Sequence, residues 1–574
     1  MAQNAPVRPR SPRTVLRRVN VRPPRPTAST DAIFILMRRM RGPLVVLLVI
    51  FAVDVMGLTL MPGTDAAGQP HRLTFFDAFY IMSYTATTIG YGEVPYEFSI
   101  AQRMWVTFAI YSSVVGWAYA LGVLFRLLQD RAFLHAVRVQ QVGRQVRLLR
   151  EPFLIVAGYG QMGRRVAETL DAQGRRLGVV DTDPQALDQL AGGSLTIDVP
   201  GIDGDARDPG ILALAGLTHR YCEGVLALTH DDAVNLSVVM AVQLLKPEVP
   251  VYARADDRAI GEAMHDFGAN AVINPYDRFG DYLRLRLQRP ATYQLVTWLM
   301  APYDAPLQPR QQPLPPGRWV VASDDRFGGE IASDLRPAVG SVEIVDAAGE
   351  LPDIGPVVGF VAGASDESRN LALAAHARLE NPDVFLCVRA HSESLTPLLR
   401  AFAPDMVFIP SQLTAEESLA RVTTPDFWAF FRHAFGQAEA WAEALLDRLI
   451  ERQGEGSPAS RRFVLDGPTA PGAVRWLEHH SLRLGDLMRD PADRDRPLAL
   501  VPLILRRAGH DEFAPGDDTL LRTGDELVVA GHDAATDALE QTLTHTATVE
   551  YVSTGNLVPT TWLFRRLSPR VEDV

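Results

Sequence analysis

The chain has 574 residues, a formal net charge of −12 and two cysteines. This acidic balance argues against nucleic acid as a partner, because phosphate binding needs clustered positive charge. Cys222 and Cys387 lie far apart and form no Cys-x-x-Cys pair. They therefore predict reduced thiols, not a disulfide framework or a thiolate zinc site.

The first 42 residues form a basic segment with ten arginines, six prolines and one acid, Asp31. We expect this segment to be disordered and to contact anionic lipid. The positive-inside rule places it in the cytoplasm. Two membrane spans would return the chain to the same side, so both termini are expected to be cytoplasmic in a multi-pass protein of the cell (inner) membrane.

Two apolar stretches are long enough to cross a bilayer. Pro43–Met61 is apolar except for Asp54, and Met104–Phe125 holds 22 residues without a charge. About 20 apolar residues span the hydrocarbon core. Because a carboxylate at membrane depth usually faces protein or water, we expect Asp54 near the start of a pore helix or in a water-filled crevice.

Between these spans, the aromatic-rich stretch Thr74–Thr85 predicts a short re-entrant helix whose C-terminal dipole end favours a cation. The residues that follow, 87–93, read Thr-Thr-Ile-Gly-Tyr-Gly-Glu. Gly90 and Gly92 stand at alternate positions, and glycine adopts positive φ without a Cβ clash. Such alternation lets successive backbone carbonyls point into a pore. The expected filter residues are Thr88, Ile89, Gly90, Tyr91 and Gly92, with potassium bound at Thr88 to Tyr91.

This run resembles the Thr-Val-Gly-Tyr-Gly-Asp signature of potassium channels, with Ile89 for valine and Glu93 for aspartate. The second change touches the packing behind the filter, so we expect it to bear on inactivation more than on selectivity. One filter per chain supplies one quarter of a pore, which predicts a homotetramer in a lipid bilayer. Gly116 or Gly122 would provide a gating hinge in the second span, and close helix packing is the alternative role.

A dinucleotide fingerprint follows the membrane region. The apolar run Phe153–Ala157 predicts a buried strand that leads into a glycine-rich turn and a helical pattern. Gly158 permits the tight turn, Gly160 lets a phosphate approach the backbone, and Gly163 lets helix and strand pack closely. The six residues of the fingerprint are Gly158, Tyr159, Gly160, Gln161, Met162 and Gly163.

Asp181 ends the next predicted strand, where its carboxylate can accept hydrogen bonds from ribose hydroxyls. A carboxylate there disfavours a 2′-phosphate, so NAD, NADH or another adenine nucleotide is favoured over NADP. With the strands that follow, the region from Pro152 to about Pro275 resembles the RCK domain (also called KTN or TrkA-N), which regulates potassium conductance. The resemblance implies that Asp205 and Thr229 lie near the adenosine, and Arg254 near the phosphates or a neighbouring subunit.

Arg254 has an alternative role, a salt bridge to one of the nearby acids, Asp256 or Asp257. Calcium-gated RCK domains resemble one another in carrying a glutamate at this place on the strand. A cation there opposes calcium, so a calcium site is disfavoured, although Asp231 and Asp232 add acidic density nearby.

A second strand–turn–helix pattern begins at Arg318. Ser323 and Asp325 replace the first two glycines of the fingerprint, and Gly328 remains. A carboxylate at the phosphate-approach position repels pyrophosphate. We expect a second RCK module that lacks one strand–helix unit and is structural or binds a different ligand.

The predicted fold class is a membrane α-helical pore domain, with two spans and a re-entrant pore helix, followed by α/β Rossmann-like RCK domains and a small α+β C-terminal lobe. Residues 521–531 resemble the TrkA-C lobe of RCK regulators. The predicted domains are 1–42 (basic tail), 43–128 (pore domain, with spans 43–61 and 104–125 and pore helix and filter 74–93), 129–151 (helical linker), 152–300 (first RCK module with a crossover helix), 301–317 (linker), 318–455 (second RCK module with helices), 462–545 (TrkA-C-like lobe) and 546–574 (tail).

Together these resemblances imply a ligand-gated potassium channel that is not an enzyme. Two RCK modules per chain give eight in a tetramer, so no separate soluble RCK subunit is required. The alternatives are a membrane-tethered NAD-dependent oxidoreductase and a subunit of a potassium uptake transporter. Against these, the chain shows no Tyr-x-x-x-Lys motif or substrate domain beside the fingerprint, and it carries one filter where such transporters carry four.

Overall fold

The computed structural model describes residues 32–65, 69–130, 141–193, 195–301, 303–310, 313–350, 354–391 and 396–556. The basic segment predicted at 1–42 lies mostly outside these residues, as does part of the linker predicted at 129–151. The chain divides into two compact units, one of Met1–Ala253 with Glu262–Ala271 and one of Arg254–Gly261 with Val272–Val574.

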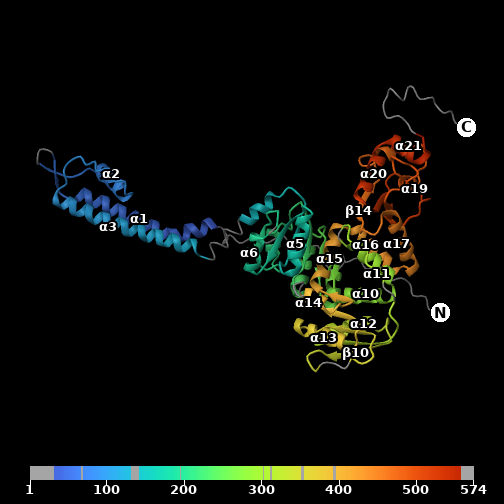
Figure 1. Cartoon of the computed structure of the whole chain (residues 1–574). Coiled ribbons are helices and arrows are strands. Elements are labelled where there is room, and N and C mark those ends of the chain that lie inside the picture. The colour runs from blue at the N-terminus through green and yellow to red at the C-terminus, as the bar shows by residue number, and fades with distance from the viewer. Residues whose placement is uncertain are drawn as a thin grey trace, which may run out of the picture. The chain divides into compact units, whose positions relative to one another are not determined.

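Two long apolar helices and one short helix form the N-terminal part (Figure 1). Helix α1 (Ala32–Leu60) and helix α3 (Ile100–Leu128) are long and apolar enough to cross a membrane. Both extend beyond the apolar runs that predicted them. Helix α3 begins early because Ser99 and Gln102 form a capping box that satisfies its first N–H groups.

Helix α2 (Phe75–Ala86) lies between them and matches the predicted re-entrant helix closely. Thr74 caps it by accepting a hydrogen bond from the Asp77 N–H. The three helices share one apolar core, because α1 contributes Val55 and Leu58, α2 contributes Ile81 and Met82, and α3 contributes Ala109. This core holds the C-terminal end of α2 beside both long helices.

The first α/β module is a six-stranded sheet in the order β5-β4-β3-β6-β7-β8. Strand β3 pairs in parallel with β4 on one side and β6 on the other, so the strand order reverses direction at β3. This arrangement is the doubly wound pattern that binds nucleotides at the carboxyl ends of its central strands. The strands are β3 (Phe153–Ala157), β4 (Arg176–Asp181), β5 (Gly201–Asp203), β6 (Cys222–Ala227), β7 (Val251–Arg254) and β8 (Ala271–Ile273), and the helices are α5 (Gln161–Ala172), α6 (Pro184–Gly192), α7 (Pro209–Leu214), α8 (Asp232–Leu245) and α9 (Arg258–Asp266).

The second α/β module is a five-stranded parallel sheet in the order β10-β9-β11-β12-β13. Compared with the first sheet, the described residues contain no outer strand equivalent to β5, in agreement with the predicted loss of one strand–helix unit. The strands are β9 (Arg318–Ser323), β10 (Ser341–Asp346), β11 (Gly359–Ala362), β12 (Phe385–Arg389) and β13 (Met406–Phe408), and the helices are α12 (Arg326–Leu335), α13 (Glu367–Glu380) and α14 (Thr396–Arg400).

A helix pair follows the last strand of each sheet. The single crossover helix expected at the end of the module predicted at 152–300 is instead two helices, α10 (Pro275–Gln288) and α11 (Pro290–Met300). Pro290 ends the first helix, because proline lacks an N–H and disfavours helical backbone in the residue before it. The same pattern recurs after β13, where α15 (Pro410–Thr423) and α16 (Pro425–Gly436) meet at a Thr-Pro step.

Helix α10 packs on the second sheet, since Phe279 and Leu283 share a core with Trp319, Phe327 and Phe408. The Phe279 and Phe408 rings stack with centroids 4.2 Å apart. The crossover segment of the first module therefore forms part of the second module's core.

The C-terminal lobe is a four-stranded antiparallel sheet in the order β14-β17-β15-β16. The tail predicted from residue 546 instead starts with helix α21, which packs on α18, α19 and α20 and buries Val549 and Val552. Its two apolar positions are too few for a strong periodic signal in the sequence. The elements are α17 (Glu439–Gln453), β14 (Ala459–Val464), α18 (Pro471–Leu477), α19 (Leu484–Leu487), β15 (Leu500–Arg507), β16 (His510–Phe513), β17 (Glu526–Gly531), α20 (Asp533–Thr544) and α21 (Thr546–Thr554).

Both cysteines are buried free thiols, in agreement with the sequence. Burial raises the pKa of Cys222 to about 11 and also raises the pKa of Cys387. Each is therefore protonated and unreactive at neutral pH.

Two half-buried carboxylates of α12 make the stability of the second unit depend on pH. Burial and the acids Asp277 and Asp281 of α10 raise the pKa of Asp334 to about 6, and burial with Asp277 raises the pKa of Glu330 to about 7. Asp256 also faces Glu330, while Arg326 opposes the shift at Glu330, and Arg258 and Arg284 oppose it at Asp334.

An acid with a raised pKa in the folded state binds more protons folded than unfolded, so folding is favoured at low pH. We expect this contribution to be fully present below about pH 4 and to be lost as the pH rises through 6 and 7. Thermal unfolding of the whole protein is measured between pH 5.5 and 8 for the wild type and for the double variant Glu330→Gln/Asp334→Asn. The unfolding temperature of the variant minus that of the wild type should be several degrees larger at pH 8 than at pH 5.5. An unfolding temperature that changes in parallel for both proteins would contradict this assignment.

Candidate pore loop and nucleotide site

The loop after α2 has the alternating backbone that the glycine spacing predicted. Gly90 and Gly92 have φ values of +63° and +72°, and Thr88 adds a third left-handed residue at +58°. The positive φ of Thr88 was not predicted, because threonine rarely adopts this conformation and its sequence gives no signal for it. Left-handed residues at 88, 90 and 92 therefore alternate with ordinary residues at 89 and 91, so the orientation of the backbone reverses from one residue to the next.

Hydrogen bonds from the end of α2 fix this loop. The carbonyl of Tyr84 accepts hydrogen bonds from the N–H groups of Ile89 and Gly90, at 3.0 and 3.2 Å. The Tyr84 hydroxyl donates to the carbonyl of Glu93 at 2.8 Å, so one tyrosine joins both ends of the loop. The Tyr91 ring lies edge-on to it, with centroids 6.1 Å apart.

Glu93 also contacts α2 through its side chain, because the Tyr80 hydroxyl donates to its carboxylate at 3.0 Å. The sequence placed Glu93 behind the filter but did not identify Tyr80 and Tyr84 as its partners. Two tyrosines four residues apart on one helix face were the available signal.

Asp54 does not lie in a water-filled crevice, which was one of its two expected places. It is on α1, with 1% of its surface exposed. Ser112 donates to both carboxylate oxygens at 3.0 Å, and Ser113 donates to one at 3.2 Å. The expectation was wrong because these serines, on α3, are more than fifty residues away in the sequence. Asp54 therefore joins the two long helices.

Replacing Asp54 with alanine should lower the thermal stability of the detergent-solubilised protein by removing these bonds. We expect a loss of about 1–3 kcal/mol. The upper value is typical of hydrogen bonds to a charged group, and the lower value allows for the weaker hydrogen bonds measured within membranes. The double variant Asp54→Ala/Ser113→Ala should cost less than the sum of the single changes. Additive effects would contradict a direct interaction.

The two candidate hinge glycines have different surroundings. A Cβ at Gly116 would lie 2.8 Å from the Ile50 side chain of α1, whereas a Cβ at Gly122 would meet nothing within 4 Å. Gly116 thus has the close packing contact that was the alternative to a hinge, and Gly122 has no such contact among the described residues. Helix α3 runs through both positions without interruption.

In the first α/β module, each glycine of the fingerprint has the surroundings that its predicted role requires. Gly158 has a φ of +99° and lies against the backbone of Thr229. A Cβ at Gly163 would lie 1.9 Å from the Gly158 carbonyl oxygen, so only glycine allows α5 to approach β3 this closely. Gly160 caps α5, and the space beside it is open to 4 Å. The turn therefore leaves room for a group at the N-terminus of α5, beside Gln161 and Met162.

Asp181 reaches back to this turn from the end of β4. One carboxylate oxygen accepts a hydrogen bond from the Tyr159 N–H at 2.5 Å, and the other accepts one from the Asp183 N–H at 2.8 Å. Its position at the carboxyl edge of the sheet is the one that the fingerprint predicts for a ribose acceptor.

Asp205 and Thr229 follow β5 and β6. The Arg207 guanidinium donates to both carboxylate oxygens of Asp205, at 2.6–3.1 Å, and this partner holds the pKa of Asp205 below its usual range. The Thr229 hydroxyl and N–H both donate to the Asn235 side chain, at 2.8 and 3.1 Å, and Asn235 is fully buried.

Asn235 was not predicted as a site residue, although a repeated spacing marks it. In the second module, Asn370 also lies eight residues after the end of a strand, and it bonds the N–H and the carbonyl of Ala364, six residues before it, as Asn235 bonds those of Thr229. The two asparagines hold equivalent loops in the two modules.

Arg254 has its partner within the chain. At the end of β7, its guanidinium donates to both oxygens of Asp256 at 2.7 Å, which is the salt bridge that was the alternative to a phosphate contact. Asp231, part of the acidic density near Arg254, and Asp257, the other possible salt-bridge partner, each accept hydrogen bonds from N–H groups that begin a helix. Within the described ranges, no group of three or more His, Cys, Asp or Glu side chains is placed to hold a metal ion.

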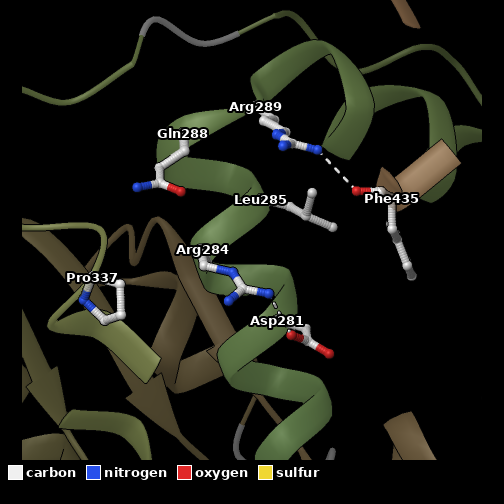
Figure 2. A pocket seen from close by; sticks show the side chains of 7 residues that line it. All are labelled: Asp281, Arg284, Leu285, Gln288, Arg289, Pro337 and Phe435. Carbon is white, nitrogen blue, oxygen red and sulfur yellow. Dashed lines mark hydrogen bonds and ion pairs between the residues drawn. The ribbon is translucent and has the colours of Figure 1, made fainter. Parts of the chain in front are cut away.

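A cavity of about 350 Å³ lies beside α10 and was not predicted (Figure 2). Its two guanidinium groups are already bound. Arg284 donates to Asp281 at 2.9 Å, and Arg289 donates to the carbonyls of Phe435 and Gln437 at 2.8 and 3.0 Å. The Arg289 contacts fix the end of α10 against the end of α16.

Comparison with known proteins identifies two modules in the chain. Residues 44–130 match the family model described as ion channel, and residues 154–275 match the family model described as TrkA-N domain. The chain is therefore a membrane protein that joins an ion-channel module to a TrkA-N (RCK) module, the combination that the resemblances predicted.

Its relatives include two proteins of Methanocaldococcus jannaschii. The chain is 24% identical over 202 residues to potassium channel protein 1 of Methanocaldococcus jannaschii, and 23% identical over 202 residues to probable potassium channel protein 2 of the same organism. Each match covers 35% of this chain, and the chain spans 59% and 57% of the length of these two relatives. A solved structure described as the GsuK channel bound to NAD is similar at 15% identity and a TM-score of 0.43, covering 89% of this chain and 99% of that one.

Proposed function

We propose that this chain is a subunit of a homotetrameric potassium channel gated by a nucleotide. The observation that carries the proposal is the loop at 88–92, in which left-handed residues alternate with ordinary ones directly after a short helix of an ion-channel module. In this conformation the carbonyls of Thr88, Ile89, Gly90 and Tyr91 replace the hydration shell of potassium. Four chains are needed to close the ring of carbonyls around the ion.

The first α/β module binds the regulatory nucleotide, NAD or another adenine nucleotide. The open space at Gly160 admits the phosphates to the N–H groups at the start of α5, where the helix dipole favours negative charge. Asp181 accepts hydrogen bonds from the ribose after exchanging its contact with the Tyr159 N–H. Asp205 and Thr229 lie along the edge where the adenosine binds.

Nucleotide binding changes the conductance through the soluble modules. Eight RCK modules from four chains form a gating ring on the cytoplasmic side, with both termini of each chain on that side. The ligand shifts the ring between two shapes only by its different affinity for each of them. The segment between α3 and β3 passes the change to the pore-lining helix, and Gly122 is the candidate bend within that helix.

Single-channel recording in a planar bilayer tests this proposal. NAD⁺ is added to the side that carries the soluble modules, and the open probability is compared before and after the addition. The proposal predicts a reversible change in open probability at constant unitary conductance, because the ligand binds in the α/β module and not in the filter. Conducting channels that respond neither to NAD⁺ nor to ADP would refute nucleotide gating.

A further inference from the structure

The second module retains the strand–turn–helix geometry of a phosphate-binding turn. Side chains of the module itself accept the hydrogen bonds that a phosphate would accept from this turn. A Cβ added at Gly328 would lie 2.7 Å from the Ser323 Cβ, so α12, like α5 in the first module, packs against the preceding turn with no room for a side chain at this position. The module thus differs from the first in the side chains of Ser323 and Asp325, which occupy the positions of Gly158 and Gly160.

Asp325 occupies the space that Gly160 leaves open. One oxygen of its carboxylate accepts hydrogen bonds from the Phe327 N–H and the Ser323 hydroxyl, both at 3.0 Å. The Ser323 hydroxyl in turn accepts a hydrogen bond from the Gly328 N–H at 3.1 Å. These N–H groups at the start of α12 are the donors that a phosphate would otherwise use.

Arg389 supplies the positive charge that completes the arrangement. It ends β12, its side chain is 6% exposed, and it donates to the second oxygen of Asp325 at 2.7 Å. Its guanidinium lies over the Phe327 ring, 4.9 Å from the centroid. A buried cation facing a helix N-terminus is suited to an anion, and here the anion is a carboxylate of the chain.

The same arginine reaches the crossover segment. Its other terminal nitrogen lies 3.4 Å from the hydroxyl of Tyr276, the second residue of α10. The Tyr276 ring also lies beside Phe327 and Phe408, with centroids 5.8 and 6.1 Å away. The chain of contacts from Asp325 through Arg389 to Tyr276 therefore joins the turn of the second module to the start of α10.

We propose that Asp325 acts as a built-in substitute for a nucleotide phosphate. The second module is then permanently in a ligand-occupied form that holds α10, and each chain binds one nucleotide, in its first module. The stoichiometry rests on the proposed nucleotide binding by the first module, whereas the anchoring of α10 does not.

Two measurements on the full-length protein in detergent test the proposal. Equilibrium dialysis with radiolabelled ADP should give one nucleotide per wild-type chain. The double variant Ser323→Gly/Asp325→Gly should add a second, weaker site, because Arg389 and the α12 N–H groups then face open space. Combining it with Gly160→Asp separates the two sites, since the second site should persist when the first is lost.

Hydrogen exchange of α10 gives the independent readout. Asp325→Asn should speed exchange in the first turn of α10 at least tenfold. The matched control Asp324→Asn should not, because Asp324 bonds Ser365 on a neighbouring loop and makes no bond to Arg389. Two nucleotides per wild-type chain would overturn the substitution of phosphate by Asp325, and unchanged α10 exchange in Asp325→Asn would overturn the anchoring. No ADP binding by the wild type, with exchange altered as expected, would instead count against the proposed function of the first module.

Discussion

Replacing Gly160 with aspartate is expected to abolish nucleotide regulation and to leave a conducting pore. The new carboxylate would cap the first turn of α5 as Asp325 caps α12, which keeps the fold and fills the space meant for phosphate. Two like charges 4 Å apart at an effective dielectric of 20 repel by about 4 kcal/mol. This corresponds to about a thousandfold loss in affinity.

The measurement is the open probability of single channels as a function of NAD⁺ concentration, together with direct nucleotide binding. Gly192→Asp is the matched control, because Gly192 also has open space around its Cβ position and lies at the end of α6, away from the turn. This control should respond to nucleotide like the wild type. Normal nucleotide sensitivity in Gly160→Asp would remove the turn at 158–163 from the binding site.

Replacing Gly90 with alanine is expected to abolish selective potassium current. At a φ of +63°, alanine costs about 1–2 kcal/mol, and a tetramer bears this cost in four chains at the same ring of carbonyls. The strain is relieved by rotating the peptide, which removes a carbonyl from the ion path. Gly42→Ala on α1 is the control, since Gly42 has ordinary backbone and an open Cβ position.

The readout is the ratio of potassium to sodium permeability in bilayer recordings, with size-exclusion chromatography to verify the assembled protein. Gly42→Ala should keep the wild-type ratio. An assembled Gly90→Ala protein that conducts potassium with undiminished selectivity would contradict the assignment of the filter to 88–92.

Much of this architecture was predictable because the informative residues act through their own backbone. Gly90, Gly92 and Gly158 require positive φ, and Gly163 requires the absence of a Cβ, so their spacing alone indicates the turn. Apolar runs of membrane length, and the strand that precedes the fingerprint, are equally local signals.

The features that escaped prediction depend on residues distant in sequence or on small local energies. Asp54 finds its serine partners on another helix, and Arg389 finds Asp325 across the second sheet. The left-handed Thr88 lies in a loop that Tyr84 holds through hydrogen bonds with Ile89, Gly90 and Glu93. The break at Arg289–Pro290, by contrast, carried a readable signal, because the residue before a proline tends to leave the helix.

The central claim is that the chain forms a potassium-selective pore, and the reversal potential tests it most directly. Purified protein is recorded in a planar bilayer with potassium on one side and sodium on the other, without added nucleotide and then with NAD⁺ present. We predict a reversal potential near the potassium equilibrium value whenever channels open. A current that reverses near zero, or no current under either condition, would contradict the account.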